Sequence, residues 1–416
     1  MEGNSASNIL KILIIVLIVA AVVGVVLLAI MLIFGVSMFG MRFVIVDGKL
    51  SGQPDDKNPI TLTNSNWESV ETIDITTTVW NVEVRPFSNA DDRQYQISGK
   101  DCVNVLFYGQ YTGFIKGDVE ASLKKPVYGR NSVGEQSLLI ETNEPEVVWL
   151  SKGDTKVVVL YDEGVLANKK VRIHTQGGEV YLGSKSSQYT RGDLPSVSIQ
   201  NSDGKVVVGN INVSDSLEVT KDKGDLYFTT DITGNLNLSI NSGFGTVQLK
   251  NVGNPNVNSG VSVNFGKIDN SNITFDTIYG DLQYIEGNSG LIRGNYVTGS
   301  LIVNDTKACV FKIENVRKNV IFNSDSGSLY VPTIGGSMQS IMKGNGSINV
   351  KNIGGDSTIS AKNGLVTLGL DYENSSNTNT GIKGDVDITS EGGDIKIKCA
   401  DSLPSGVLLK IRAINS

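Results

Sequence analysis

The sequence is poor in the residues that most often carry out chemistry or form disulfide bonds. It contains one histidine and three cysteines among 416 residues, and the cysteines have neither CxxC nor metal-ligand spacing. These shortages disfavour a histidine-based catalytic triad, a zinc site and a disulfide framework. Cys309 and Cys399 fall on inward positions of alternating strands about five repeats apart, beyond disulfide reach, so we expect buried free thiols.

Positive charge is scarce as well. The net charge is −7, and no basic stripe runs along the chain, so nucleic acid is not an expected partner. After the first forty residues the sequence shows no helical periodicity, phosphate-binding loop or dinucleotide fingerprint. The single histidine, His174, alternates with Val171 and Ile173 and is therefore expected to point outward on a strand. We expect no cofactor, no metal site and no enzymatic activity.

Glycine, by contrast, is abundant and regularly placed. The segments SDSGSLYVPTIGG, GNGSINVKNIGG and KNGLVTLGL place Gly327, Gly346 and Gly364 ahead of near-identical apolar patterns. Apolar residues follow each of these glycines at the second and fourth positions, and in the first two segments also at the seventh. Corner glycines of the same kind occur elsewhere in the chain: Gly178, Gly204, Gly224, Gly245 and Gly393. This is the pattern of a structural repeat.

The spacing of the corners predicts the fold. Corners recur at about nine or ten residues, so two corners make a repeat of roughly nineteen residues. We expect glycine at the corners because a turn with positive φ is less costly without a side chain. The predicted fold is all-β, a parallel β-solenoid (β-helix), expected to be right-handed, in which Val, Ile, Leu and Phe of successive coils stack inward.

The regular repeats occupy residues 171–416, with loop insertions expected near 183–195 and 372–381. Residues 67–170 are less regular and hold all of the tryptophans after the apolar N-terminal run. Because a solenoid must cover its open end, we interpret this irregular β region as a cap. The alternative is a carbohydrate or peptide groove lined by aromatic side chains. The candidates for that lining are Phe107, Tyr108, Tyr111 and Phe114.

The first forty residues contain the longest apolar run. Residues 12–39, from Ile12 to Phe39, are almost uninterrupted Ile, Leu, Val, Ala, Met and Phe. The charge-free part alone forms a helix of roughly 35 Å at about 1.5 Å per residue, which is enough to cross a lipid bilayer. We therefore expect a short tail at 1–11, a transmembrane helix at 12–39 and a linker at 40–66. A cleaved signal peptide would need a shorter apolar stretch and a small-residue cleavage site.

The flanking charges do not decide how such a helix is oriented. Lys11 lies before the apolar run, and Arg42 and Lys49 lie after it. The β region is rich in Asn, Thr, Ser and Gly, which favours a position outside the cell. The expected location is the cell membrane, crossed once, with the β domain extracellular.

Arg191, Gly192 and Asp193 form the tripeptide that integrins bind when it lies at a loop tip. It falls in the insertion expected near 183–195. These three residues and the four aromatic residues form our candidate interaction surface.

Carboxylates gather near the C-terminus, where parallel β-helices can host polysaccharide lyases and hydrolases. The cluster consists of Asp385, Asp387, Glu391 and Asp394. Like charges on alternating outward positions usually form a solvated strand face, and Gly-Asp pairs at corners fit turns. The glycine-aspartate nonapeptide that binds calcium in solenoids is absent.

The repeats resemble a bacterial β-strand-repeat family of unknown function whose members are described as adhesins. The segments that carry the resemblance are TQGGEVYLGS, KDKGDLYFTTDITGNLNLS, SDSGSLYVPTIGG and GIKGDVDITSEGGDIKIK, with IDITTTVWNVEVRP matching the opening strands. The likeness covers the chain from Ile73 to its end. It implies an envelope protein on the outer face with a role in surface display or envelope stress, and it provides no catalytic residues.

Three functional hypotheses follow. The first is a non-enzymatic, single-pass, membrane-anchored surface β-solenoid with a structural or adhesin-like role, whose partners are the bilayer and an envelope polysaccharide or a surface protein. The second is a cytoplasmic, membrane-tethered, bactofilin-like scaffold that self-associates through the ends of its solenoid. The third is a carbohydrate-active β-helix.

Overall fold

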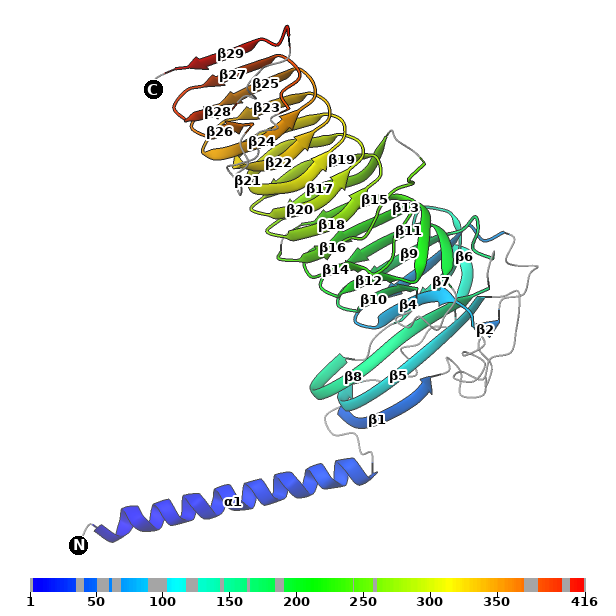
Figure 1. Cartoon of the computed structure of the whole chain (residues 1–416). Coiled ribbons are helices and arrows are strands. Elements are labelled where there is room, and N and C mark those ends of the chain that lie inside the picture. The colour runs from blue at the N-terminus through cyan, green and yellow to red at the C-terminus, as the bar shows by residue number, and fades with distance from the viewer. Residues whose placement is uncertain are drawn as a thin grey trace.

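Short strands rich in Val, Ile, Leu and Phe make up most of the chain after the first forty residues (Figure 1). The computed structural model describes residues 3–34, 41–50, 60–61, 69–88, 103–116, 126–142, 146–162, 165–183, 191–241, 243–256, 260–369, 381–398 and 405–414. Cys399 and residues 372–380 of the expected insertion therefore lie outside the described residues.

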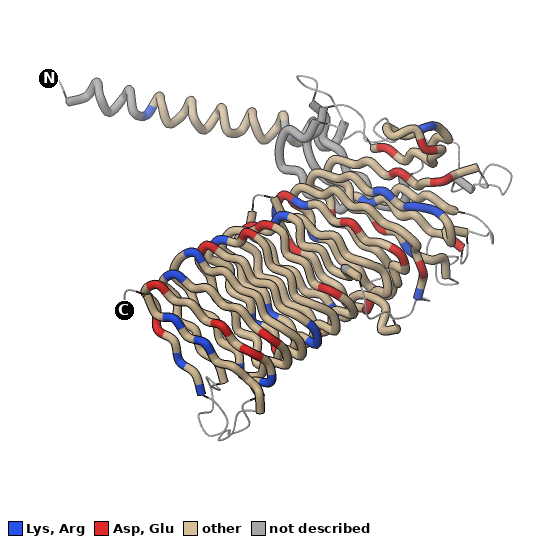
Figure 2. Tube along the Cα trace, turned by 90° about the horizontal axis from the view of Figure 1, so that it is seen from above, with Lys and Arg blue, Asp and Glu red and all other residues tan. Residues whose placement is uncertain are grey.

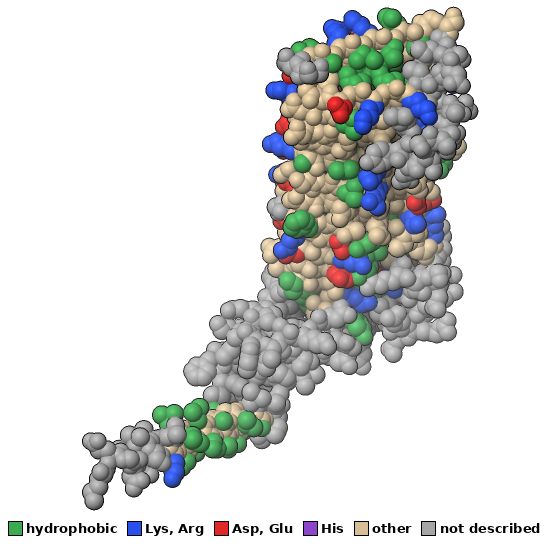
Figure 3. All heavy atoms as spheres, turned by 60° about the vertical axis from the view of Figure 1, so that its left-hand side comes forward, with side chains coloured by type: hydrophobic (Ala, Val, Ile, Leu, Met, Phe, Trp, Pro, Cys, Tyr) green, Lys and Arg blue, Asp and Glu red, His purple; other side chains and the backbone are tan. Residues whose placement is uncertain are grey.

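The N-terminal segment is one helix, α1 (Gly3–Phe34). It begins at Gly3 rather than at Ile12, so most of the predicted tail is helical, as expected for a stretch that contains the helix formers Ala6 and Leu10. The described side chains of residues 12–26 include many exposed apolar groups, and Figure 3 shows them as a green surface on the helix. In the part of the chain that the structure describes, no helix is long and apolar enough to cross a membrane.

Two parallel ladders of strands run through the β region, and the chain alternates between them (Figure 1). Ladder A contains, in spatial order, β8 (Glu146–Tyr161), β4 (Asn81–Pro86), β10 (Val180–Gly183), β12 (Val206–Gly209), β14 (Leu226–Phe228), β16 (Thr246–Gln248), β18 (Asn272–Ile278), β20 (Leu291–Val297), the second halves of β21 (Leu301–Val316) and β22 (Val320–Ile334), β24 (Gly346–Ile353), β26 (Leu365–Leu368) and β28 (Ile395–Ile397).

Ladder B lies across the core from ladder A. It contains β7 (Gln136–Glu141), β3 (Thr72–Thr77), β9 (Lys170–Thr175), β11 (Gly192–Asn201), β13 (Ile211–Lys221), β15 (Asn235–Ile240), β17 (Val261–Asp269), β19 (Asp281–Asn288), the first halves of β21 and β22, β23 (Met338–Met342), β25 (Ser357–Ala361), β27 (Val386–Ser390) and β29 (Leu409–Ala413). The strands β21 and β22 take part in both ladders because they continue through the corner between them.

The register of the ladders confirms the predicted repeat. Ile273 pairs with Ile292, and Ile292 pairs with Phe311, so the chain advances 19 residues between equivalent positions (292 − 273 and 311 − 292). The step is longer where an insertion intervenes, as between Val180 and Val206.

An antiparallel group of strands lies at the N-terminal end of ladder A (Figure 1). β1 (Met41–Leu50) and β2 (Ile60–Thr61) pair with β5 (Val103–Lys116), and β5 pairs with β8. β6 (Val127–Arg130) pairs antiparallel with β7 at the same end of ladder B. The region predicted as a linker at 40–66 thus contains strands, because its β-branched and aromatic run from Phe43 to Val46 finds a partner in β5.

The inward side chains of both ladders form one hydrophobic core. Ile348 and Val350 are fully buried and Asn349 between them is half-buried, which confirms the predicted inward phase of these strands. Edge-to-face aromatic contacts run along part of this core, and the ring centroids of Tyr284 and Phe311 are 5.2 Å apart. Charged residues of both signs are interspersed over the outside (Figure 2).

The corner glycines are needed for a different reason from the predicted one. Of the eight singled out in the sequence, only Gly224 has a positive φ, of 94°. A Cβ atom on Gly204 would lie 1.9 Å from the carbonyl oxygen of Gly178, and one on Gly346 would lie 1.9 Å from that of Gly327. Glycine is required because the backbones of successive corners approach too closely for a side chain.

Polar side chains are buried beside these corners. Asn201 Nδ2 donates a hydrogen bond to the Gly178 carbonyl at 2.8 Å. On the next strand, Lys221 Nζ donates to Asn201 Oδ1 at 2.5 Å and to the Gly204 carbonyl. Burial lowers the pKa of Lys221 to about 8, although nearby carboxylates oppose this effect. These side chains satisfy corner carbonyls that lie away from water.

Candidate functional site

The predicted aromatic surface does not form as a unit. Phe107 is only 2% exposed and packs edge-to-face on Trp80, with ring centroids 6.2 Å apart. Its assignment to an interaction surface is therefore wrong, because alternation along β5 turns its side chain into the core. Tyr108 points to the other side of β5, where Lys156 Nζ lies 5.5 Å from its ring centroid.

Tyr111 and Phe114 also belong to β5, but their side chains lie outside the described residues. Their backbone register is described: Phe114 pairs with Phe43 of β1 and with Trp149 of β8. These two residues remain candidates from the sequence alone.

The Arg-Gly-Asp tripeptide lies at the start of a strand and not at a loop tip. Gly192 and Asp193 are the first residues of β11 and pair with Ile211 and Asn212 of β13. Gly192 is buried, and a Cβ atom there would lie 2.3 Å from Pro86 Cγ. Arg191 lies just before the strand, but Gly192 and Asp193 are paired in the parallel ladder, so the three residues do not form a loop tip and the predicted loop position is corrected.

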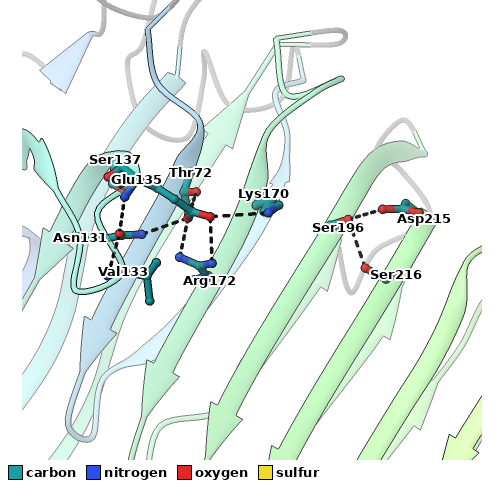
Figure 4. Close-up of polar contacts among 10 residues, drawn as sticks. All are labelled: Thr72, Asn131, Val133, Glu135, Ser137, Lys170, Arg172, Ser196, Asp215 and Ser216. Carbon is teal, nitrogen blue, oxygen red and sulfur yellow. Dashed lines mark hydrogen bonds and ion pairs between the residues drawn. The ribbon is translucent and has the colours of Figure 1, made fainter.

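A compact polar network joins the turn between β6 and β7 to β3 and β9 of ladder B (Figure 4). The Glu135 carboxylate accepts hydrogen bonds from Arg172 Nη1 at 2.6 Å, from Thr72 Oγ1 at 2.8 Å and from Asn131 Nδ2 at 3.2 Å. Lys170 Nζ lies 3.6 Å from the same carboxylate. Burial alone would raise the pKa of Glu135, but these hydrogen bonds and the Arg172 charge lower it to about 2.

This network links segments of the chain that are distant in sequence. Its members come from β3, β9 and the turn before β7, and the Glu135 carboxylate lies beside two cations, Arg172 and Lys170. Figure 4 also shows the smaller cluster of Ser196, Asp215 and Ser216, in which Ser196 Oγ donates to Asp215 Oδ2 at 2.7 Å. Both clusters hold strands together.

The C-terminal carboxylates hold the last strand in place. Asp387 Oδ2 lies 2.8 Å from Arg412 Nη2 and 3.5 Å from Lys410 Nζ, both on β29. Asp385 Oδ1 accepts a hydrogen bond from the Leu408 backbone N–H at 2.7 Å. Two of the four carboxylates considered for carbohydrate chemistry are therefore engaged in strand contacts.

A groove of about 570 Å³ on the outer face of ladder A is the best candidate for a binding site. One wall is a row of outward side chains on consecutive strands: Gln248, Thr274, Arg293 and Lys312. The other wall is a second row: Lys250, Asp276, Asn295 and Glu314. Leu249 and Phe275 lie between the rows, are almost fully buried and line the floor of the groove together with Phe228 and Gly294.

Gly294 contributes to the shape of this floor. It occupies an inward position on β20, where a Cβ atom would lie 1.9 Å from Phe275 Cζ. The aromatic ring of the neighbouring strand therefore fills the space that a side chain would take. The groove could have been found from the sequence only by aligning the repeats, since a step of 19 residues places Arg293 beside Lys312 (312 − 293).

The prediction that His174 points outward is confirmed: its side chain is exposed, with Nδ1 3.0 Å from Gln200 Oε1.

Among the described side chains, no three His, Cys, Asp or Glu residues gather closely enough to hold a metal ion. Comparison of the chain with protein-family models, with curated proteins and with solved structures found no match.

Proposed function

We propose that this chain is a membrane-anchored β-solenoid that acts on the cell surface as a non-enzymatic structural or adhesin-like protein. The observation that carries the proposal is the alternation of the chain between two parallel ladders around one core. In this architecture each repeat contacts only its neighbours, and the product is a long, rigid surface for display or binding.

The helix α1 supports the anchoring part of the proposal. Ile12, Leu17 and Val25 expose 62%, 62% and 69% of their surfaces, and exposed apolar side chains occur on every face of the described segment 11–27. A helix that is apolar all round is stable only when apolar surroundings cover it. Lipid chains are the surroundings that fit an N-terminal helix joined to a polar β domain.

The anchoring is tested by extracting membranes with alkaline carbonate. We expect the full-length protein to stay with the membranes and the double variant Leu17→Lys/Val22→Lys to be released, because two charges in an apolar helix oppose insertion. The matched control is Lys223→Gln/Lys343→Gln, which changes two charged side chains on the β domain. Release of the unchanged protein by carbonate would contradict the anchoring.

A second candidate function is a scaffold that polymerises end to end. The strand β29 pairs only with β27 among the described strands, and Leu408 and Ile411 are 61% and 46% exposed beside its free edge. Figure 3 shows green apolar side chains near the upper end of the stack. An unpaired strand edge can add a strand from a second copy.

Sedimentation of the detergent-solubilised protein distinguishes the two functions. A scaffold would form long assemblies that Ile411→Lys disrupts by placing a charge at the free edge. A surface protein of the proposed kind would sediment as one small species, unchanged by that substitution.

A further inference from the structure

Two cations of the groove, Arg293 and Lys312, lie side by side. Arg293 of β20 pairs directly in register with Lys312 of β21, and both side chains are exposed. In the described part of the chain neither side chain takes part in an ion pair or a hydrogen bond. Adjacent strands are about 4.8 Å apart, so these like charges repel one another. An anion bound between them would relieve the repulsion.

The opposite wall differs in charge. Lys250 Nζ lies 3.5 Å from Asp276 Oδ2, and these two charges offset each other. Glu314 and Asn295 complete this wall and offer acceptors for hydroxyl groups. The groove therefore fits a ligand that carries carboxylates along one side and hydroxyl groups along the other.

Aromatic rings continue the first wall at both ends. Tyr227 pairs in register with Gln248 at one end of the row, and Tyr330 pairs with Lys312 at the other. Lys205 Nζ lies 4.5 Å from the Tyr227 ring centroid and therefore covers one face of that ring. Tyrosine rings offer an apolar face and a polar edge, which suits the face of a sugar ring.

The groove fits a glycan better than a peptide. An extended peptide usually binds by adding a strand to a free sheet edge. Here the strands beneath the groove are paired on both sides, so their backbone hydrogen-bonding groups are already used within the ladder and a peptide cannot add as a further strand. The spacing of about 4.8 Å between strands is close to the length of one sugar ring in an extended glycan.

We propose that this groove binds an acidic polysaccharide along the axis of the stack, with a uronate carboxylate held between Arg293 and Lys312 and sugar hydroxyls facing Asn295 and Glu314. The proposal rests on the proposed function and names the class of its envelope partner. It requires no catalysis, since no bond is made or broken.

The test measures binding of polygalacturonate to the full-length protein in detergent micelles by calorimetry. We expect binding that weakens at least about tenfold in Arg293→Gln/Lys312→Gln, because charge-assisted contacts to the carboxylates are lost. The control Lys362→Gln/Lys383→Gln removes the same two charges from exposed turns outside the groove and should bind as the unchanged protein does. Circular dichroism and the unfolding midpoint confirm that each variant is folded.

Two further probes identify the ligand class. Methyl-esterified polygalacturonate keeps the sugar backbone but lacks the charges, and it should bind weakly. Poly-L-glutamate keeps the charges but lacks the sugar, and it should also bind weakly. The proposal is overturned if polygalacturonate does not bind, if either probe binds equally well, or if both double variants lose binding alike. Because the assay uses detergent, failure of membrane anchoring would leave its outcome unchanged.

Discussion

Single side chains test the inward and outward phase of the strands. Val350 is fully buried in the core, whereas its neighbour Asn349 points outward and is half-buried. We expect Val350→Asp to lower the free energy of unfolding by at least about 3 kcal/mol, because it buries a charge among apolar side chains. Asn349→Asp should change it by less than about 0.5 kcal/mol. Urea unfolding measures both free energies. Similar losses of stability in the two variants would show that the inward and outward side chains of this strand are assigned wrongly.

The Glu135 network predicts a loss of stability in acid. The folded state lowers the pKa of Glu135 from 4.5 to about 2, so it favours the charged carboxylate. This stabilisation is complete above pH 4.5 and disappears as the pH falls toward 2. We expect Glu135→Gln to reduce stability at neutral pH and to flatten its dependence on pH in this window.

Urea midpoints measured in steps across the same window check this expectation. Glu218→Gln is the matched control, since Glu218 is exposed on a nearby strand of ladder B. If the stability of Glu135→Gln and of the unchanged protein fell equally in acid, the Glu135 network would not be the cause of the acid response.

The sequence predicted these residue environments unevenly. Alternation alone placed Ile348 and Val350 inward, because every second side chain of a strand points to the same face. It could not place Glu135, whose partners Thr72 and Arg172 lie 63 and 37 residues away. Nor did it identify Lys221 as buried, because its burial depends on hydrogen bonds at the corner of a neighbouring strand.

At the scale of elements, the close approach of successive corners is testable. We expect Gly346→Ala to cost about 1–3 kcal/mol, because its Cβ would meet the Gly327 carbonyl oxygen and a backbone atom cannot easily move away. Gly129→Ala is the control, since its Cβ would meet only Leu139 Cδ1 at 3.4 Å, an ordinary contact. Thermal unfolding compares the two variants, and equal midpoints would refute the steric explanation.

The repeat itself predicts which deletions the fold tolerates. Gly327 pairs with Gly346, so removing residues 327–345 deletes one step of 19 residues and leaves both ladders in register. Removing only residues 327–336 would direct the chain into the wrong ladder. We expect the first variant to fold with a strand-rich circular dichroism spectrum and cooperative unfolding, and the second to aggregate. If the variant lacking residues 327–336 folded and the variant lacking residues 327–345 aggregated, the stacking of 19-residue repeats would be contradicted.

Elements that repeat were predictable, and elements that pair once were not. The spacing of Gly327, Gly346 and Gly364 indicated the repeat length because each unit meets the same neighbours. The pairing of β1 with β5 has no such signal, since an antiparallel partner distant in sequence leaves no local pattern. The position of Gly192 inside β11 was missed because the sequence pattern there was interpreted as an insertion.

At the scale of the whole molecule, the proposed membrane anchor, the proposed binding groove and the free strand edge lie at different positions along the two ladders. The apolar helix α1 precedes the antiparallel end, the groove lies on ladder A between β16 and β21, and the free edge of β29 lies at the far end (Figure 1). This order suits a protein that is held at one end and makes contacts along its length.

Antibody labelling of intact cells tests the central claim most directly. An epitope is fused after Ser416, and labelling is compared before and after the cells are permeabilised. A surface-anchored β-solenoid predicts full labelling of intact cells with no increase on permeabilisation. Labelling that occurs only after permeabilisation would place the β domain inside the cell and contradict the proposed function.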